Sequence, residues 1–128
     1  ELNLASSLPM IVVDKHRLEQ VLVNVISNAC QAMTRMKRQG KIRISTEVGP
    51  SVYRKNDAGR SSVIRFIVED NGPGIPEDVK KDLFGSYTPK KNSYGLFLCK
   101  SIIDRHNGEL KLLGSETGTK IEISLPII

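Results

Sequence analysis

The most constraining feature of this sequence is the segment Asp70-Asn71-Gly72-Pro73-Gly74-Ile75-Pro76, which directly follows the apolar run Val63–Val68. The run predicts a buried strand. The two glycines permit positive φ angles and let a ligand approach the backbone, and Pro76 suits the first turn of a helix. An acid, a glycine loop and a helix after a strand fit a nucleotide pocket. The same residues also make a good pair of turns, so the segment alone leaves both interpretations open.

Length and composition point to one globular domain. The chain has 128 residues, of which 39% are hydrophobic and 26% are charged, as is typical of soluble domains with a real core. Cys30 and Cys99 form no Cys-x-x-Cys pair, which disfavours a zinc site or a disulfide framework. No signal-peptide pattern and no apolar run of about 20 residues is seen, so we expect a cytoplasmic location and no direct membrane contact.

The positive charge is dispersed along the chain. The formal net charge is +5, but the basic residues cluster only as the pairs Lys37-Arg38, Lys80-Lys81 and Lys90-Lys91. A nucleic-acid footprint needs a clustered basic face. We therefore expect no nucleic-acid partner.

A long amphipathic helix is predicted to begin after Asp14, a good N-cap, and to end at Gly40. Its apolar positions recur at steps of three and four and define a buried stripe: Leu18, Val21, Leu22, Val25, Ile26, Ala29, Met33 and Met36. A second stripe carries four carboxamides, Gln20, Asn24, Asn28 and Gln31. Asparagine is a poor helix former, so this stripe needs a reason. Either it is a solvated or loop-bonded face, or it offers oxygen ligands to Mg²⁺.

The remaining pattern predicts a two-layer α/β sandwich, with a mixed, mostly antiparallel sheet of about five strands and the helices packed on one face. His106 lies in the apolar stripe of the second long helix, and we expect it to be packed and hydrogen-bonded rather than catalytic. The expected elements are strands at Leu8–Val13, Lys41–Val48, Val63–Val68, Leu110–Leu113 and Thr119–Leu125, a long hairpin connection at Gly49–Ser62, helices at Glu77–Phe84 and Tyr94–His106, the latter closed by Asn107-Gly108, and a flexible segment at Gly85–Ser93.

Four segments and one single residue, in chain order, resemble the motifs of the ATP-binding catalytic domain of sensor histidine kinases, in the superfamily that includes gyrase-type, MutL-type and heat-shock chaperone ATPases. Residues 20–32 are similar to the asparagine box and residues 70–75 to the first glycine box. Phe84 stands at the position of the phenylalanine motif. Gly95-Leu96 resembles the second glycine box, whose helix continues to Gly108. Residues 118–126 resemble the closing strand.

The resemblance implies a Bergerat-type ATP-binding fold over residues 9–128, with residues 1–8 as a linker or tail. It implies ATP and Mg²⁺ as cofactors. Asp70 would accept a hydrogen bond from the adenine amino group, with support from Thr119. Asn28 would ligate Mg²⁺, with Asn24 beside it, and these two asparagines are the expected catalytic residues. The other expected nucleotide-binding residues are Gly72, Gly74, Ile75, Gly95 and Leu96, and the charge and position of Lys90 and Lys91 add these two as phosphate contacts.

The residue at position 24 separates branches of the superfamily. Hydrolysing relatives carry a glutamate four residues before the metal asparagine, where it acts as the general base for water. This chain has Asn24 there, and a neutral amide cannot accept a proton from water. The sequence therefore favours phosphoryl transfer, which depends on positioning and charge neutralisation.

Two departures from the motifs leave the function open. The segment from Phe84 to Gly95 is short for the family and retains only Gly95 of the second glycine box. Gln31 stands where many relatives have a phosphate-contacting lysine. The alternatives to a histidine kinase are therefore a nucleotide-binding or docking module with little transfer activity, and a related protein-serine kinase of the anti-sigma-factor type.

The expected partners of a histidine kinase lie outside this chain. The resemblance implies a separate phosphoacceptor domain carrying the substrate histidine, in cis or across a dimer, and a response-regulator receiver domain. His16 is expected at the surface and His106 in the core, so neither is an acceptor candidate. The full-length protein could place this domain in the cytoplasmic part of a membrane-bound sensor.

Overall fold

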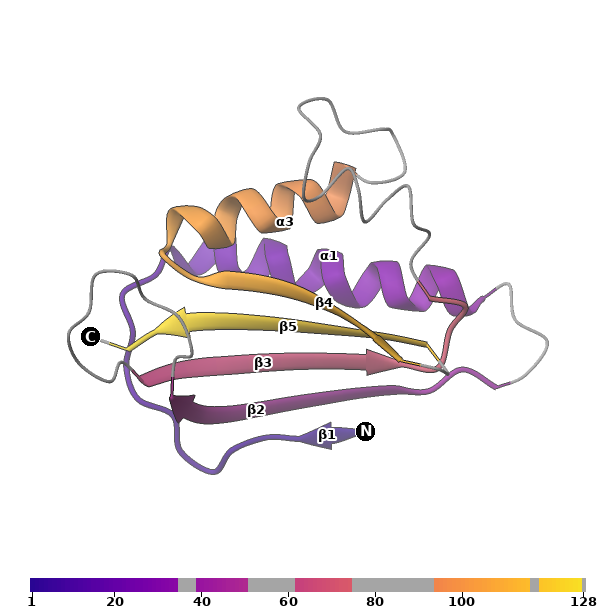
Figure 1. Cartoon of the computed structure of the whole chain (residues 1–128), viewed down its shortest axis with the longest axis horizontal. Helices are drawn as coiled ribbons and strands as arrows, with labels where there is room; N and C mark the ends of the chain where they lie inside the picture. The colour runs from indigo at the N-terminus through magenta and orange to yellow at the C-terminus, as the bar shows by residue number, and fades with distance from the viewer. Residues whose placement is uncertain (35–38, 51–61, 75–93, 116–117, 128) are drawn as a thin grey trace.

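The structure, a computed structural model, describes residues 1–34, 39–50, 62–74, 94–115 and 118–127. Within these residues a sheet and two helices form an α/β fold (Figure 1). The elements are β1 (Leu2–Asn3), α1 (Lys15–Met33), β2 (Ile42–Pro50), β3 (Ser62–Asp70), α3 (Tyr94–Arg105), β4 (Glu109–Ser115) and β5 (Gly118–Pro126). The predicted helix Glu77–Phe84 and the segment Gly85–Ser93 lie outside the described residues.

The five strands are arranged in the order β1-β2-β3-β5-β4. The β1–β2 pair is parallel and the other three pairs are antiparallel, which confirms the mixed, mostly antiparallel sheet. Gly49 and Pro50, expected in a connection, belong to β2, where they pair with Val63 and Ser62. β3 and β5 are paired along their length from Val63↔Pro126 to Asp70↔Thr119.

The strand predicted at Leu8–Val13 is wrong, because residues 4–14 contain no strand. Met10 and Val12 are 90% and 80% exposed, and Pro9 has no N–H to donate. The edge strand lies earlier, inside the expected linker. Ile44 N donates to Glu1 O at 2.9 Å and Ala5 N donates to Thr46 Oγ1 at 2.8 Å, so this part of the expected linker is attached to the sheet.

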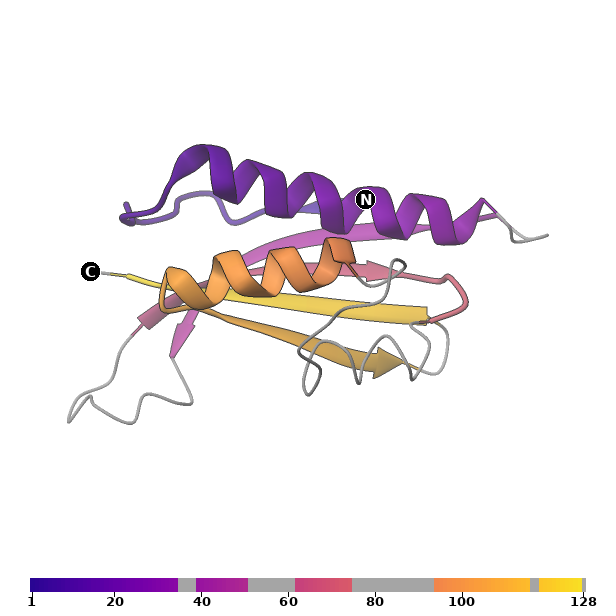
Figure 2. The ribbon, with the colours of Figure 1, turned by 90° about the horizontal axis from the view of Figure 1, so that it is seen from above.

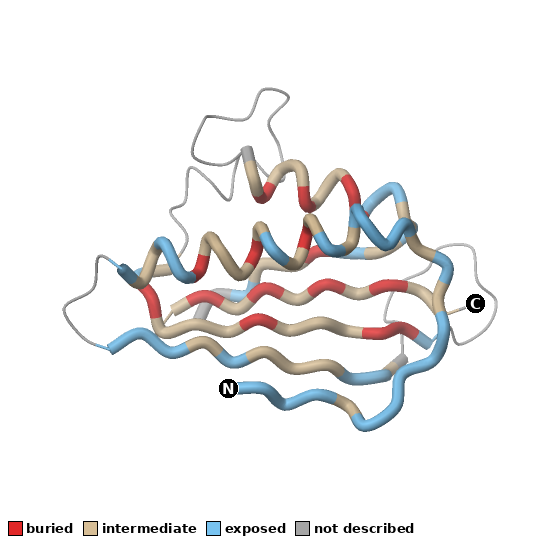
Figure 3. Tube along the Cα trace, turned by 180° about the vertical axis from the view of Figure 1, so that it is seen from behind, coloured by how far each residue is buried: buried red, intermediate tan, exposed pale blue. Residues whose placement is uncertain are grey.

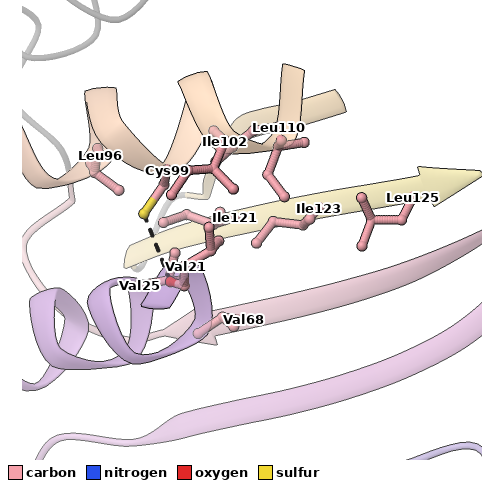
Figure 4. Close-up of a cluster of buried hydrophobic side chains, with 11 residues drawn as sticks. Val21, Val25, Val68, Leu96, Cys99, Ile102, Leu110, Ile121, Ile123 and Leu125 are labelled. Carbon is pink, nitrogen blue, oxygen red and sulfur yellow. Dashed lines mark hydrogen bonds between the residues drawn. The ribbon is translucent and has the colours of Figure 1, made fainter. Parts of the chain in front are cut away.

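Both helices contribute to one core against one face of the sheet (Figures 2 and 3). The burial of β5 alternates strictly, with Thr119, Ile121, Ile123 and Leu125 buried, as expected for a strand with one covered face. Figure 4 shows Ile121, Ile123 and Leu125 on the face of β5 that the helices cover. Cys99 of α3 donates to the Val21 carbonyl of α1 at 3.7 Å. The predicted two-layer packing is confirmed.

The predicted start of α1 is confirmed and its predicted end is wrong. Asp14 caps the helix by accepting from Arg17 N at 3.2 Å. The helix ends at Met33, before Gly40, and Thr34 is its C-cap. The Thr34 hydroxyl donates to the Gln31 carbonyl at 2.7 Å, an alternative to the helical hydrogen-bond pattern. No helix of the described residues is long and apolar enough to cross a membrane.

His106 joins the end of α3 to the start of α1. Its Nδ1 lies 2.8 Å from the Ile102 carbonyl and its Nε2 accepts from Asp14 N at 3.1 Å, so the prediction of a hydrogen-bonded histidine is confirmed. Asn107 then takes a φ of 59°, and Gly108 N donates to the Ile103 carbonyl at 3.0 Å. This left-handed residue closes the helix, as the Asn107-Gly108 pair predicts.

Candidate functional site

Most of the described residues that were expected to bind the nucleotide lie together at the end of β3, where the glycine loop begins. Asp70 is the last residue of β3 and pairs directly with Thr119 on β5. α1 crosses this end of the sheet and brings Asn28 to the same place, and the first turn of α3 adds Leu96. A cavity of about 50 Å³ lies between these elements, lined by Val25, Asn28, Ala29, Ala32, Val68, Asp70, Gly74, Leu96, Thr119 and Ile121.

The cavity has an apolar body and few polar groups. Asn28, Asp70 and Thr119 supply its polar side chains, and aliphatic residues supply most of the rest. This composition is typical of small-molecule sites, in which a few polar groups fix the orientation of a flat or apolar ligand. Ligand sites of this kind commonly have volumes of about 300–1,000 Å³, so the cavity between the described residues, at about 50 Å³, is smaller than a typical small-molecule site.

The Asp70 carboxylate is oriented by its own loop. Gly72 N donates to Asp70 Oδ1 at 2.8 Å, which holds one oxygen and leaves Oδ2 without a hydrogen-bond partner among the described residues. A Cβ on Gly72 would lie 2.9 Å from the same Oδ1. Gly74 has a φ of +87°, a conformation that glycine adopts readily. The two glycines therefore permit the loop shape that fixes this carboxylate beside the cavity.

Asn28 and Asn24 occupy the same side of α1 but differ in their surroundings. Asn28 lines the cavity, and a Cβ on Gly95 of α3 would lie 3.7 Å from its Nδ2. Asn24 is half-buried and does not line the cavity. Burial raises the pKa of the Cys99 thiol from 9.0 to about 11, and a hydrogen bond with the Asn24 side chain opposes this rise. Asn24 therefore faces α3, one helical turn from Asn28.

The polar side chains at the cavity suit a magnesium ion that takes most of its ligands from a nucleotide and from water. Among the described residues, no group of three or more His, Cys, Asp and Glu side chains gathers to form a complete metal site. Mg²⁺ commonly takes one or two protein oxygens and completes its shell with water and phosphate oxygens. Asn28 lines the cavity, and its carboxamide carries an oxygen of the type that Mg²⁺ takes as a ligand.

The structure describes seven of the expected nucleotide-binding positions and not the others. Five of the seven line the cavity or its rim: Asn28, Asp70, Gly74, Leu96 and Thr119. Gly72 is buried against Asp70 and Gly95 lies near Asn28. Ile75, Lys90 and Lys91 lie outside the described residues. The four residues of the carboxamide stripe have different surroundings. Gln31 is exposed, and Gln20 accepts from Arg17 Nη1 at 3.3 Å.

Several residues at the cavity lie inside the matched motifs, but the sequence predicts no site role for them. Val25 and Ala29 were assigned to the core alone, yet they form the floor of the cavity beside Asn28. Ala32 lies one turn after Asn28, and small residues at these positions are the signal that could have found this wall. Gly118 has a stricter role, because a Cβ there would lie 1.9 Å from the Asp70 carbonyl oxygen. No sequence pattern marks that contact.

A larger hollow lies beside the β2–β3 pair. Its volume is about 450 Å³, and its lining includes Lys41, Arg43 and Glu69. Arg43 and Glu69 are cross-strand partners, and they alternate with the core-facing residues of their strands. Of the residues expected to bind nucleotide, only Asp70 borders this hollow, so we place the candidate site at the smaller cavity.

Comparisons with known proteins identify the family of this chain. Residues 13–128 match the family described as histidine kinase-, DNA gyrase B- and HSP90-like ATPases. The chain is 34% identical over 127 residues to the sensory histidine kinase/phosphatase NtrB of Vibrio alginolyticus, covering 95% of this chain and 35% of that protein. It is 33% identical over 131 residues to the sensor protein TdiS of Thauera aromatica, covering 98% of this chain and 22% of that protein. The chain thus spans about a third or less of these relatives.

Solved structures show the same fold. The catalytic domain of histidine kinase ThkA superposes with a TM-score of 0.70 at 28% identity, covering 98% of this chain and 75% of that chain. The Acinetobacter baumannii histidine kinase AdeS superposes with a TM-score of 0.67 at 27% identity, covering 98% of this chain and 52% of that chain. These matches extend over nearly all of the present chain.

Proposed function

Since the chain belongs to the family of histidine kinase-, DNA gyrase B- and HSP90-like ATPases, we propose that it is the catalytic domain of a two-component sensor histidine kinase. In this proposal it binds Mg-ATP and transfers the γ-phosphoryl group to a histidine of a separate phosphoacceptor domain. The observation that carries the proposal is the convergence of Asn28, Asp70 and Thr119 on one cavity.

In this proposal the adenine ring lies against the described residues of the cavity. Its edge carries an amino donor, and Oδ2 of Asp70, which has no hydrogen-bond partner among the described residues, is an anionic acceptor. Such a pairing is stronger than one between neutral groups. Thr119 lies directly across the strand pair from Asp70 and offers a hydroxyl to the same edge. Val25, Val68 and Leu96 supply apolar surface, on which a flat ring can be buried.

The asparagines would serve the phosphate end of the nucleotide. Asn28 would hold the magnesium ion, which neutralises phosphate charge when it is bound. Asn24, held toward α3, carries no carboxylate that could activate water. This supports transfer to an acceptor over hydrolysis, because phosphoryl transfer depends mainly on alignment and charge stabilisation. The proposed partners are the phosphoacceptor domain of the same kinase and a response-regulator receiver domain.

Calorimetric titration with ADP and with a non-hydrolysable ATP analogue, each with and without Mg²⁺, tests the binding half of the proposal. We expect micromolar dissociation constants, about −8 kcal/mol at 1 μM, that depend on Mg²⁺. Absence of binding at millimolar nucleotide would contradict the proposal and favour a docking module.

Transfer is tested by incubating the domain with labelled ATP and a separately produced phosphoacceptor domain of the same kinase. We expect label on the acceptor that is lost in acid and retained in alkali, because a phosphohistidine is acid-labile. Acid-stable label would indicate a serine kinase. Binding of nucleotide without any labelling would favour the docking module.

A further inference from the structure

The second residue of the glycine loop, Asn71, is bonded to a segment on the far side of the loop. Its Oδ1 accepts from Lys41 N at 2.8 Å, and its Nδ2 donates to the Gln39 carbonyl at 3.1 Å. Its backbone N donates to the Lys41 carbonyl at 3.2 Å. The Asn71 side chain thus bonds one backbone carbonyl and one backbone N–H of residues 39–41, the short stretch that precedes β2.

This stretch is packed against the end of α1. A Cβ on Gly40 would lie 2.9 Å from Met33 Sδ and 3.0 Å from Met33 Cβ, so the backbone of Gly40 rests on the Met33 side chain. A Cβ on Gly72 would lie 3.4 Å from Met33 Cγ. Met33 therefore lies between Gly40 and Gly72, and the end of α1, the stretch 39–41 and the glycine loop form one continuous set of contacts.

The other side of the loop carries the adenine contact. Gly72 N donates to Asp70 Oδ1 at 2.8 Å, and Gly74 lines the cavity. The residue between Asp70 and Gly72 is the one bonded to residues 39 and 41. Displacing Asn71 would therefore displace both the hydrogen bond that orients the Asp70 carboxylate and the glycine that borders the cavity.

We infer that Asn71 is a positioning residue for nucleotide binding, which fixes the glycine loop and the Asp70 carboxylate through its hydrogen bonds to residues 39 and 41. This inference rests on the proposed function. A polar turn residue with no such role would face solvent or bond within its own turn. Asn71 instead bonds across about 30 positions of sequence, and its amide uses both its acceptor and its donor there.

The test compares Asn71→Ala with Asn71→Asp, which keeps the acceptor for Lys41 N but lacks the donor for the Gln39 carbonyl. Asn3→Ala, at an exposed asparagine of the edge strand β1, is the matched control. Each variant is titrated with ADP, and amide hydrogen exchange is followed at Lys41 and Gly72. Thermal unfolding monitors the fold.

For Asn71→Ala we expect a roughly tenfold weaker ADP affinity, since two hydrogen bonds are lost, and faster exchange at Lys41 and Gly72 with the other strand amides still protected. Asn71→Asp should retain protection at Lys41 and bind ADP with intermediate affinity. Asn3→Ala should match the wild type in both measurements.

Two results would overturn the inference while the proposed function stands. In one, Asn71→Ala binds ADP as the wild type does. In the other, its affinity falls only together with faster exchange throughout the sheet, which would make the residue generally structural. Failure of the wild-type domain to bind ADP would instead reject the proposed function itself, and with it the role of Asn71.

Discussion

Asp70 and Thr119 are directly paired across β3 and β5, and both side chains line the same cavity. Nearly fifty residues separate them in sequence, and the antiparallel pairing of two strands brings them together. Neighbouring core positions on the same strands, Val68 and Ile121, are also cross-strand partners and form the apolar wall beside them. The register of β3 and β5 therefore places a polar pair, Asp70 and Thr119, next to the apolar pair where the glycine loop begins.

Asp70→Asn should abolish tight nucleotide binding and leave the fold intact. The amide can still accept from Gly72 N through Oδ1, so the loop bond is kept. The other oxygen, Oδ2, is replaced by an amide NH₂ group, a donor that would face the adenine amino donor. A lost hydrogen bond to a charged group costs about 1.5–3 kcal/mol, so we expect ADP affinity to fall by roughly 10- to 150-fold in calorimetric titration.

Glu69→Gln is the matched control for Asp70→Asn. Glu69 neighbours Asp70 in β3 but points to the other side of the sheet, where it lines the larger hollow with Arg43. It should bind ADP as the wild type does. Equal affinities for wild type and Asp70→Asn would contradict the adenine role of Asp70.

Asn28→Ala should weaken nucleotide binding in Mg²⁺ more than in EDTA. The carboxamide oxygen is the only part of this side chain that can ligate a metal, and its loss leaves the apolar wall of the cavity in place. We expect about a tenfold loss of affinity with Mg²⁺, equivalent to about 1.4 kcal/mol, and a smaller loss without it. Titration with the ATP analogue under both conditions measures the difference.

Gln20→Ala, at the other end of the carboxamide stripe, provides the comparison for Asn28→Ala. Gln20 contacts Arg17 and does not line the cavity, so its truncation should leave both affinities unchanged. Equal losses for Asn28→Ala in EDTA and in Mg²⁺ would mean that Asn28 is structural.

Gly118→Ala should destabilise the domain strongly, whereas Gly95→Ala should not. A Cβ at Gly118 would lie 1.9 Å from the Asp70 carbonyl oxygen, so backbone must move. Overpacking typically costs about 1–3 kcal/mol. At Gly95 the nearest atom of the described residues, Asn28 Nδ2, would be 3.7 Å from an added Cβ. Alanine is also the better helix former by up to about 1 kcal/mol.

Urea unfolding of both glycine variants measures this contrast in the free energy of unfolding. The expected order of stability is Gly95→Ala at or above the wild type, and Gly118→Ala well below it. Similar stabilities for the two variants would show that Gly118 does not need its close approach to Asp70.

Local sequence patterns predicted most of the fold because they report which face of an element is buried. The alternation of Thr119 to Leu125 and the helical spacing of Val21, Val25 and Ala29 correspond directly to the buried positions. The same reasoning failed at Leu8–Val13, where apolar residues do not pair with any strand. Edge pairing depends on available backbone groups of β2, and residues 1–3 pair with this strand instead.

The sequence predicted the site residues whose type is unusual for their secondary structure. It did not predict the residues that matter only because of what packs against them. Asparagines inside a helix and an acid before two glycines are conspicuous, and Asn28 and Asp70 lie at the cavity. Ala32 and Gly118 are ordinary residues in ordinary places. Their importance comes from what lies opposite them, which a single sequence does not encode locally.

The buried thiol of Cys99 should make the domain less stable in alkali. Burial raises the pKa of this thiol to about 11, whereas its ordinary value is 9.0. Below pH 9 the thiol is protonated in both the folded and the unfolded chain. Between pH 9 and 11 the unfolded chain releases the proton more readily, so unfolding is favoured as the pH rises.

A pKa difference of two units corresponds to about 2–3 kcal/mol, so the free energy of unfolding should fall by about this amount across that range. Urea unfolding at pH 8 and at pH 11 measures the fall. Cys99→Ala should be less stable overall, but its free energy of unfolding should not show the part of the alkaline fall that the thiol causes. Cys30→Ser should retain it, because the Cys30 thiol is exposed. An identical alkaline loss in Cys99→Ala and in the wild type would show that other groups cause it.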